Sequence, residues 1–259
     1  MSKKYLSDLE ICGVEHLSDK HVLLKLTQPE PLPEIEPGQF VEVKVSDSPH
    51  TFLRRPISVN YVDRELNQLW LLVAVVGEGT RHLSTMRKGQ KLSCLFPLGN
   101  GFTFPPVSDG NVLLIGGGVG TAPLLYFGQQ LHLRGLRPLF LLGGRSAKDI
   151  LQVELFGKYG DVFFTTEDGS LGEKGFVTEH PLLRESSFSH IYCCGPKPMM
   201  MAVARYAESH DIDCEVSLEN KMACGLGACL CCVEKTTEGN ERVCVEGPVF
   251  NIKKLLWLH

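Results

Sequence analysis

Short apolar or alternating runs, separated by proline and glycine, fill the chain up to about residue 106. Examples are residues 21–26 (HVLLKL), 40–45 (FVEVKV) and 69–76 (LWLLVAVV). The Pro-Gly pair of IEPGQF and the glycine-rich GEGT and PLGNG are turn signals. Many short strands at this spacing predict a small antiparallel β-barrel.

After about residue 110 the pattern changes, because apolar strands begin to alternate with helical periods. VLLIGGGVGTAPLLYFGQQLHLRG reads as strand, glycine turn and helix, and PLFLLGGRSAKDILQVELFGKYG repeats that order. DVFFTTEDG, HIYCCGPKPMMMAVARYAESH and CEVSLE add further strand and helix material. This alternation predicts a parallel sheet wrapped by helices.

From about residue 217 a segment dense in glycine and cysteine replaces the regular pattern. Such a composition is better explained by a bound metal cluster than by an apolar core. We therefore predict three domains: a barrel over residues 1–106, an α/β nucleotide-binding domain over residues 107–216 and a small cysteine-rich lobe over residues 217–259.

Composition and charge exclude several classes of protein. A formal charge of -4 and the absence of a Lys/Arg-rich run argue against nucleic-acid binding. The longest apolar stretch, residues 69–76, is far too short to span a membrane. No apolar segment follows the start MSKKYLSDLE, so no secretory signal is expected. The ten cysteines are then expected to be reduced thiols or metal ligands in a cytoplasmic protein.

Cysteines near the C-terminus have the spacing C-x4-C-x2-C, followed by a further cysteine after eleven residues. The triplet is the plant-type spacing for a [2Fe-2S] cluster. Gly225 and Gly227 suit a backbone that folds closely around an inorganic core. Zinc and free thiols are the alternatives, and Cys231 could replace its neighbour as a ligand, although the spacing selects Cys232. The proposed ligands are Cys224, Cys229, Cys232 and Cys244.

Two glycine-containing turns point to a dinucleotide. The first, GVGTAP at residues 118–123, follows a predicted strand and would present helix N-terminal amides to a pyrophosphate. The second, Cys-Gly-Pro at residues 194–196, would lie at the carboxyl edge of the same sheet. Each could also be a plain turn between packed elements. The expected nucleotide-binding residues are Gly118, Gly120, Thr121, Pro123, Cys194, Gly195 and Pro196.

Two motifs of the β-rich part could address phosphate groups. Arg55 and Ser58 of RPIS place a guanidinium and a hydroxyl on one extended segment, although an arginine beside a barrel strand is often only solvated. GEGT at residues 77–80 offers amides and a hydroxyl to a second phosphate, or forms a hairpin turn.

RPIS, GEGT, PLGNGF, GGGVGTAP, CGP and CGLGAC-x2-C with C-x-EGPVF occur in this order over nearly the whole chain. In this the sequence resembles the ferredoxin reductase superfamily, and within it the electron-transfer subunits of NAD-linked bacterial dihydroorotate dehydrogenases. The resemblance implies a barrel that binds FAD, a central domain that binds NAD and a lobe that binds a [2Fe-2S] cluster. Matched by position, the FAD residues would be Arg55, Pro56, Ile57, Ser58, Leu72, Val73, Ala74, Gly79 and Thr80.

The second of these FAD segments departs from the family. A Tyr-Arg pair is common there, whereas this chain has Val73 and Ala74. The side-chain contacts of that pair to the flavin would be lost, while backbone contacts could persist.

The resemblance also implies a reaction and a partner. A separate FMN-containing catalytic subunit would oxidise dihydroorotate in pyrimidine biosynthesis, and electrons would pass through the [2Fe-2S] cluster and FAD to NAD+. The complex would be a heterotetramer with two copies of each subunit, and residues 225–230 would lie at the subunit interface. This chain has no recognisable catalytic triad, carboxylate pair or H-x3-H pattern, so we expect no catalytic residue on it.

Three alternatives stay open. A diaphorase subunit of a ferredoxin or hydrogenase complex would use the same modules with another partner. A zinc-stabilised binding module without catalysis would leave the glycine and RPIS motifs unexplained. Arg145 with Ser146 could bind the 2′-phosphate of NADP, unless Arg145 merely pairs with Asp149.

Overall fold

The computed structural model describes residues 3–46, 50–106 and 110–258. Contacts divide the chain into two compact units. The first holds residues 1–101, 219–234 and 241–248, and the second holds residues 102–218, 235–240 and 249–259. The cysteine-rich segment is thus shared between the units. The division into three domains stays a prediction, and residue 107 at its first boundary lies outside the described residues.

The N-terminal part of the first unit is a closed barrel, in which each strand pairs antiparallel with its neighbours in the order β1-β2-β5-β4-β3-β6. Its strands are β1 (Tyr5–Ser18), β2 (His21–Thr27), β3 (Phe40–Val43), β4 (Arg55–Asp63), β5 (Gln68–Ala74) and β6 (Lys91–Leu98). The predicted antiparallel barrel is confirmed. Its core is apolar. The three apolar or alternating runs noted in the sequence form β2, β3 and β5.

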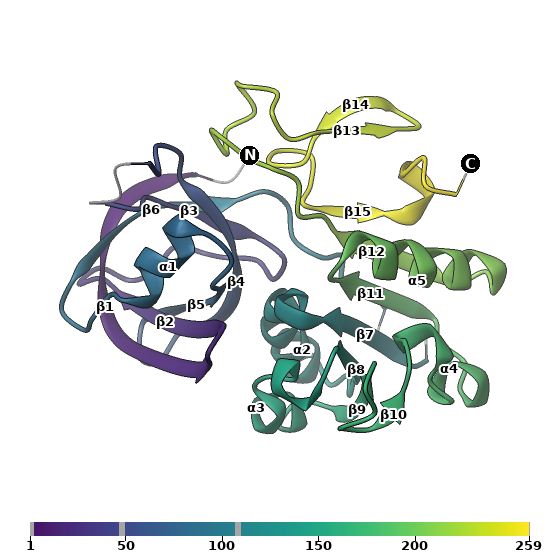
Figure 1. Ribbon diagram of the computed structural model, residues 1–259. Helices are drawn as coiled ribbons and strands as arrows, with labels where there is room; N and C mark the ends of the chain where they lie inside the picture. Colours follow the sequence, from purple (N-terminus) through teal and green to yellow (C-terminus); the bar gives the residue numbers. More distant parts are fainter. Residues whose placement is uncertain (1–2, 47–49, 107–109, 259) are drawn as a thin grey trace. The chain divides into compact units, whose positions relative to one another are not determined.

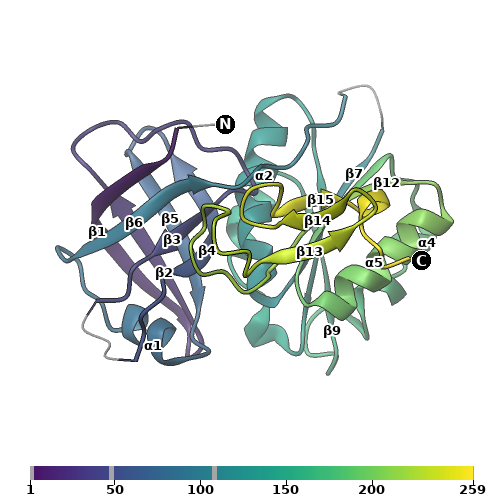
Figure 2. The same cartoon turned by 90° about the horizontal axis from the view of Figure 1, so that it is seen from above.

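Helix α1 (Glu78–Ser84) lies at one end of the barrel, as Figures 1 and 2 show. It begins within the GEGT motif, so the hairpin-turn interpretation of that motif is wrong. The hydroxyl of Thr80 accepts the backbone N–H groups of Val76 and Gly77 at 2.9 and 3.0 Å. These bonds satisfy donors that precede the first turn, which is why a helix starts here.

Strand β3 is buried along its whole length, although a barrel strand normally has one solvated face. Glu42 lies on the face that the cysteine-rich segment covers. A Cβ placed on Gly225 would meet Glu42 and Leu98 within 3.0 Å, so this segment packs directly on the strand.

The second unit contains a seven-stranded sheet in the order β10-β9-β8-β7-β11-β12-β15. Its strands are β7 (Val112–Gly117), β8 (Leu139–Gly144), β9 (Asp161–Thr166), β10 (Glu173–Lys174), β11 (His190–Cys194), β12 (Asp213–Ser217) and β15 (Val249–Asn251). The neighbours are parallel except for β15, which is antiparallel to β12. The predicted parallel sheet is confirmed.

Helices cover both faces of this sheet, with α2 and α3 on one side and α4 and α5 on the other (Figure 1). Their bounds are α2 (Ala122–Leu133), α3 (Val153–Gly157), α4 (Leu182–Glu185) and α5 (Lys197–Ser209). Because the strand order reverses beside β7, the carboxyl ends of β7 and β11 form a topological switch point, where sheets of this kind bind ligands.

The remaining elements are short. A hairpin of β13 (Val233–Thr236) and β14 (Gly239–Arg242) follows the cysteine turn. The 3-10 turns are η1 (Gly118–Thr121), η2 (Ala147–Asp149), η3 (Val177–Glu179) and η4 (Ile252–Lys254). No described helix is both long and apolar enough to cross a membrane.

Candidate functional site

Strands β4 and β5 stop pairing with each other where the first two predicted FAD segments lie. Their ladder ends at Val59 and Leu71, and in the described part of the chain residues 55–58 and 72–74 continue past it unpaired with one another. Residues 55–58 pair with β3 and residues 72–74 with β2. Both stretches run toward the same end of the barrel, so the edges that face each other carry backbone groups outside the ladder. A ligand can be held between them.

Burial limits what these segments can offer. The side chains of Leu72 and Val73 are in the core, 2% and 1% exposed, so the second segment presents its backbone and Ala74. The third segment lies against the first, because a Cβ on Gly79 would be 3.1 Å from Arg55 Nε. The structure therefore brings Arg55 and Gly79 together. The hydroxyl of Thr80 is used within its own helix.

The four cysteines predicted as ligands form two pairs. The Cys229 thiol donates a hydrogen bond to the sulfur of Cys224, and the Cys244 thiol donates to the sulfur of Cys232. Cys232 and Cys244 are buried, Cys224 is half-buried and Cys229 is exposed. Cys231 is exposed and joins neither pair. The pairing agrees with the spacing argument that selected Cys232.

Backbone N–H groups point at these sulfurs. Leu226 donates to Cys224 Sγ at 3.3 Å, and Cys244 donates to Cys232 Sγ at 3.4 Å. Burial acts to raise the pKa of Cys224, but hydrogen bonds from three backbone N–H groups and from the Cys229 thiol lower that pKa to about 6. Stabilisation of the Cys224 thiolate suits metal ligation, since the thiolate is the ligating form. Burial instead raises the pKa of Cys244 to about 12.

The arrangement fits a two-iron cluster better than a single ion. Within residues 3–46, 50–106 and 110–258, no three His, Cys, Asp or Glu side chains converge on one ion-sized site. A [2Fe-2S] cluster has four thiolate ligands shared between two irons, which two separate cysteine pairs can supply. The residues present therefore fit this cluster, and Cys224, Cys229, Cys232 and Cys244 would hold it.

Gly225 and Gly227 shape the turn, as the sequence predicted. Their φ angles of +65° and +80° lie in the left-handed region that favours glycine. A Cβ on Gly227 would lie 2.7 Å from Val245 and 3.1 Å from Arg242 Nη1. That guanidinium donates to the Gly227 carbonyl at 3.3 Å and is held in turn by a bidentate ion pair with Glu246.

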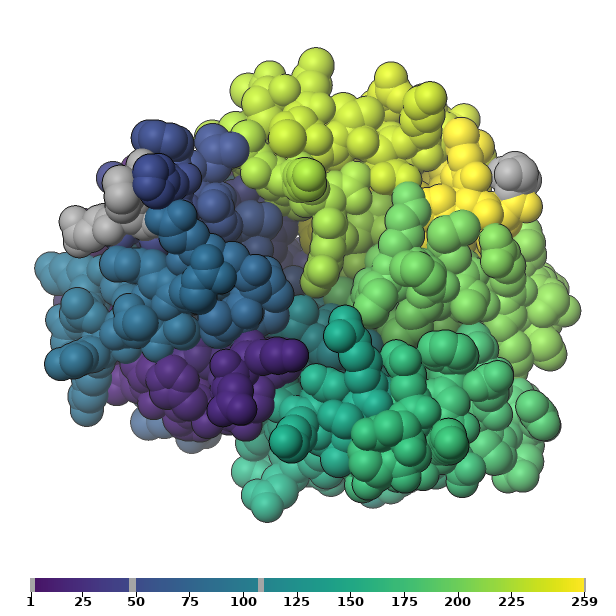
Figure 3. All heavy atoms as spheres, in the orientation of Figure 1, coloured from purple at the N-terminus to yellow at the C-terminus, as the bar shows by residue number. Residues whose placement is uncertain are grey.

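The PLGNG motif anchors this segment on the barrel. The side-chain amide of Asn100 donates to the carbonyls of Val245 and Glu246, at 3.0 Å each. Its backbone N–H donates to Gly247 at 2.7 Å. Figure 3 shows the yellow-green cysteine-rich segment beside the blue barrel strands of the same unit.

A carboxyl group is buried beneath the cysteine turn. Glu42 is fully buried, and its two carboxylate oxygens have no hydrogen-bond partner among the described residues. Burial raises the pKa of Glu42 to about 7; the charge of Arg54 acts to lower it and that of Cys224 to raise it.

The two predicted nucleotide loops meet at the switch point of the second unit. Cys194 pairs with Gly116 where β11 and β7 end. A Cβ on Gly120 would lie 2.6 Å from the Cys194 carbonyl oxygen and from Gly195 Cα, so the two turns touch and only glycine fits between them. Pro196 follows as the residue before α5.

Only part of the first loop is accessible. Gly118, with φ +55°, is half-buried and has no atom within 4 Å of an added Cβ. Gly120, Thr121 and Pro123 are buried, and Thr121 Oγ1 donates to the Gly118 carbonyl at 3.0 Å. The structure therefore leaves Gly118 free to face a ligand, while the other three shape the turn.

Arg145 stands at the same edge beside an acidic residue. The expected pair with Asp149 is absent among the described residues, because the carboxylate of Asp149 accepts from the N–H and hydroxyl of Ser146. The backbone N–H of Asp168 donates to the Arg145 carbonyl at 3.1 Å. Hydrogen bonds from the hydroxyl and N–H of Ser170 lower the pKa of Asp168, so a carboxylate is held on the loop whose backbone bonds to Arg145.

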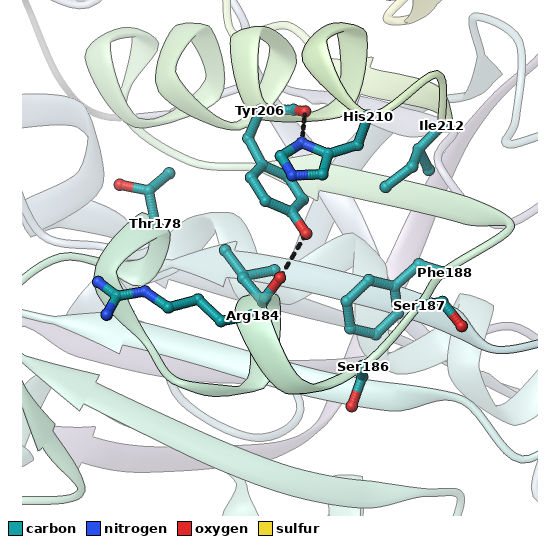
Figure 4. A pocket seen from close by; sticks show the side chains of 9 residues that line it. Thr178, Arg184, Ser186, Ser187, Phe188, Tyr206, His210 and Ile212 are labelled. Carbon is teal, nitrogen blue, oxygen red and sulfur yellow. Dashed lines mark hydrogen bonds between the residues drawn. The ribbon is translucent and has the colours of Figure 1, made fainter.

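A cavity of about 530 Å³ lies elsewhere in the second unit (Figure 4). It is lined by residues just before β11 and therefore lies toward the amino end of that strand. The Tyr206 hydroxyl donates to the Leu183 carbonyl at 2.6 Å, and His210 stacks on the Tyr206 ring. No predicted site residue lines this cavity.

Four positions at or near the candidate sites escaped the sequence argument: Glu42, Asn100, Arg242 and Asp168. Arg242 and Glu246 have the i,i+4 spacing of an ion pair, which was visible in the sequence. The sequence also shows Glu42 as a charged residue inside FVEVKV, but no local pattern indicates that the outer face of β3 is covered.

Comparisons with known proteins agree with this geometry. The family model described as the iron-sulfur cluster binding domain of dihydroorotate dehydrogenase B matches residues 219–256, and the oxidoreductase NAD-binding domain matches residues 114–205. A chain from the structure of an NADH-dependent reduced ferredoxin-NADP oxidoreductase is similar in fold. Its TM-score is 0.86 at 29% identity, over 97% of this chain and 90% of that one.

Curated relatives are more similar in sequence. The electron transfer subunit of dihydroorotate dehydrogenase B (NAD(+)) from Lysinibacillus sphaericus is 41% identical over 84% of this chain and 86% of its own length. The corresponding subunit from Fusobacterium nucleatum is 38% identical over 83% and 84%. The chain belongs to the family of electron transfer subunits of NAD(+)-linked dihydroorotate dehydrogenase B.

Proposed function

We propose that this chain carries electrons from a dihydroorotate-oxidising partner subunit to NAD+ in pyrimidine biosynthesis. It would do so with a [2Fe-2S] cluster and FAD in the first unit and a nicotinamide nucleotide in the second. The relatives named above support this function, as does the presence of all three candidate sites on one chain.

One observation carries the proposal: β3 lies between the two candidate redox sites of the first unit. Glu42 pairs with Pro56 of the first FAD segment, and its side chain touches Gly225 of the cysteine turn. Neighbouring strands are about 4.8 Å apart. The cysteine turn and the FAD segment are thus separated by little more than one strand, a short path for single electrons.

The cysteine turn would hold the cluster and stabilise its charge. Cys224 and Cys229 would hold one side, and Cys232 and Cys244 the other, with backbone N–H groups donating to the sulfurs. When bound, the cluster supplies one-electron transfer and the flavin joins two such electrons into the hydride that NAD+ accepts.

The other segments would bind and orient the remaining groups. Residues 55–58 and 72–74 would hold the flavin between their open edges, and Arg55 beside Gly79 would meet its phosphates. In the second unit, Gly118 would present its backbone to the pyrophosphate, with residues 194–196 beside it.

The partner would dock on the cysteine turn. Leu226 and Leu230 are 49% and 62% exposed and flank the exposed Cys229. Exposed leucines beside a ligand suit a face that a donor protein covers. We assign an FMN-containing catalytic subunit to this face, in an assembly of two copies of each subunit. The cytoplasmic location remains a prediction.

The test is to purify the chain anaerobically, alone and together with a dihydroorotate-oxidising catalytic subunit co-expressed with it. The chain alone should reduce ferricyanide with NADH and should leave dihydroorotate unchanged. The complex should reduce NAD+ with dihydroorotate. Oxidation of dihydroorotate by the chain alone, or a colourless and iron-free preparation, would refute the proposal.

A matched variant separates the two candidate sites. Cys232→Ser should abolish dihydroorotate-dependent NAD+ reduction in the complex while NADH-dependent ferricyanide reduction through the flavin persists. If both activities persisted, the cysteines would not lie on the electron path.

A second candidate function is that of a subunit in a ferredoxin-linked oxidoreductase. The similarity to the NADH-dependent reduced ferredoxin-NADP oxidoreductase chain, over 97% of this chain, supports it. The partner decides between the two functions, because a ferredoxin-linked complex would reduce NAD+ or NADP+ with reduced ferredoxin and not with dihydroorotate.

A further inference from the structure

Glu42 combines complete burial with a carboxylate that no described residue hydrogen-bonds. Buried carboxylates are normally paired, because removing a charge from water without compensation is costly. Neither nearby arginine hydrogen-bonds it, although the charges of Arg54 and Arg55 favour its ionised form. Arg54 donates to the backbone carbonyl of Glu42 and to Ser93, and Arg55 donates to the carbonyl of Leu53.

The side chain of Glu42 faces the cysteine turn. A Cβ on Gly225 would lie 2.7 Å from Glu42 Cγ and 3.3 Å from Oε1, so the carboxyl group lies against the backbone that follows Cys224. Leu98 is the other neighbour of Gly225 at this contact, and it contributes no polar group. No polar side chain therefore stands between the carboxyl group of Glu42 and the backbone of Gly225 at this contact.

We infer that the carboxylate of Glu42 sets the reduction potential of the iron-sulfur centre, by holding a negative charge beneath the turn that carries its ligands. The inference rests on the proposed function in that Cys224, Cys229, Cys232 and Cys244 hold the cluster. Reduction adds a negative charge to the centre. A nearby buried negative charge opposes this addition, and the low dielectric of the interior keeps the effect large. Glu42 therefore makes the centre harder to reduce.

The experiment is a redox titration of the anaerobically purified holoprotein, followed by the electron paramagnetic resonance of the reduced cluster. It is run at a mildly alkaline pH, which favours the ionised form of the carboxyl group. Glu42→Gln removes the charge and keeps the shape, and Glu42→Leu removes the charge without leaving a broken hydrogen bond. Both variants should show a more positive midpoint potential than the unmodified protein, with unchanged iron and flavin content.

Two controls isolate the buried charge. Glu42→Asp keeps a carboxylate on β3, and its potential should stay closer to that of the unmodified protein than the potentials of the neutral variants do. Glu10→Gln makes the same chemical change at an exposed position of β1, where solvent screens the charge, and should leave the potential unchanged.

Each outcome is informative. Unchanged or more negative potentials in the neutral variants would overturn the inference, and so would loss of iron from both, since Glu42 would then be needed for assembly instead. An unmodified protein that binds no iron would refute the proposed function itself. If the cluster is present but its midpoint potential does not change in the Glu42 variants, the inference fails and the proposed function is unaffected.

Discussion

The cysteine turn of the first unit and the glycine turn of the second are both candidate ligand sites, but they are held in place differently. Between the end of β12 at Ser217 and the start of β13 at Val233 there is no helix or strand. The turn in this stretch depends on hydrogen bonds to sulfur, on glycines with positive φ and on the Arg242–Glu246 pair. Polar contacts therefore determine the conformation of this turn.

The conformation of the glycine turn is instead determined by the apolar packing of the strands around it. Strands β7 and β11 are almost entirely buried and parallel, and Gly120 packs directly on the turn after β11. A sheet of this kind forms without its ligand. We therefore expect the nucleotide site to be preformed, whereas the cysteine turn gains much of its stability from the cluster.

The largest effect is expected from removing a buried ligand. Cys232→Ser or Cys244→Ser should abolish nearly all bound iron, because iron-sulfur clusters are held by thiolate and a serine hydroxyl is a poor substitute. Iron analysis and visible absorbance measure the loss, and the flavin should remain bound. Cys231→Ser is the matched control, since Cys231 is exposed and joins neither cysteine pair. Loss of iron in this control would mean that the ligand set is wrong.

A smaller effect is expected at the glycine turn. In Gly120→Ala the new methyl group would lie 2.6 Å from the carbonyl of Cys194, so the two nucleotide loops must separate. Forced overpacking of this kind costs about 1–3 kcal/mol of stability. The KM for NADH should rise, measured with ferricyanide as acceptor, while the iron content stays unchanged.

Gly157→Ala is the matched control. Gly157 also lies in the second unit and lacks a positive φ, but nothing lies within 4 Å of its Cβ position. If Gly120→Ala affected NADH binding no more than Gly157→Ala does, the contact between the two loops would not matter for the nucleotide.

The contrast between the regions also explains what the sequence could predict. Apolar runs are local signals, so the barrel and the parallel sheet were predicted from residues such as 21–26 and 112–115. The four candidate ligands were chosen from their spacing, because ligands of one cluster recur at set intervals, whereas their arrangement in two pairs was not predicted. GEGT was harder, since the same glycines suit a turn or a helix start and the hydroxyl of Thr80 decides between them.

Long-range polar contacts could not be predicted. Asn100 bonds to Val245 across 145 positions, and no local pattern links the two. For the same reason the cysteine-rich segment was expected to form a domain of its own, whereas its contacts divide between the two units. Glu42 reads as a solvated strand residue until the segment that covers it is known.

Nucleotide selectivity should respond to Asp168, a polar feature at the edge of the apolar sheet. Asp168 bonds to Arg145 through the backbone, and we expect its carboxylate to repel the 2′-phosphate of NADP, so the chain should prefer NAD. Asp168→Asn should raise kcat/KM for NADPH relative to NADH by about tenfold, because a repulsive element is removed. Adding Arg145→Ala should reverse this gain. If neither substitution changed the ratio of kcat/KM for NADPH to that for NADH, the ribose of the nucleotide would not bind near Arg145 and Asp168.

The smallest effect is expected where the cysteine-rich segment is anchored on the barrel. Asn100→Ala removes two side-chain hydrogen bonds, to Val245 and Glu246, each worth about 1 kcal/mol net. Because the turn is held by polar contacts, iron should be lost faster to a chelator and the first unit should unfold at a slightly lower temperature. Asn111→Ala is the matched control, since it removes one exposed hydrogen bond to Ser187 in the second unit. Equal iron loss in both variants would mean that the cysteine turn does not depend on the hydrogen bonds of Asn100. The proposed difference between a turn held by polar contacts and a turn held by apolar packing would then lose this support.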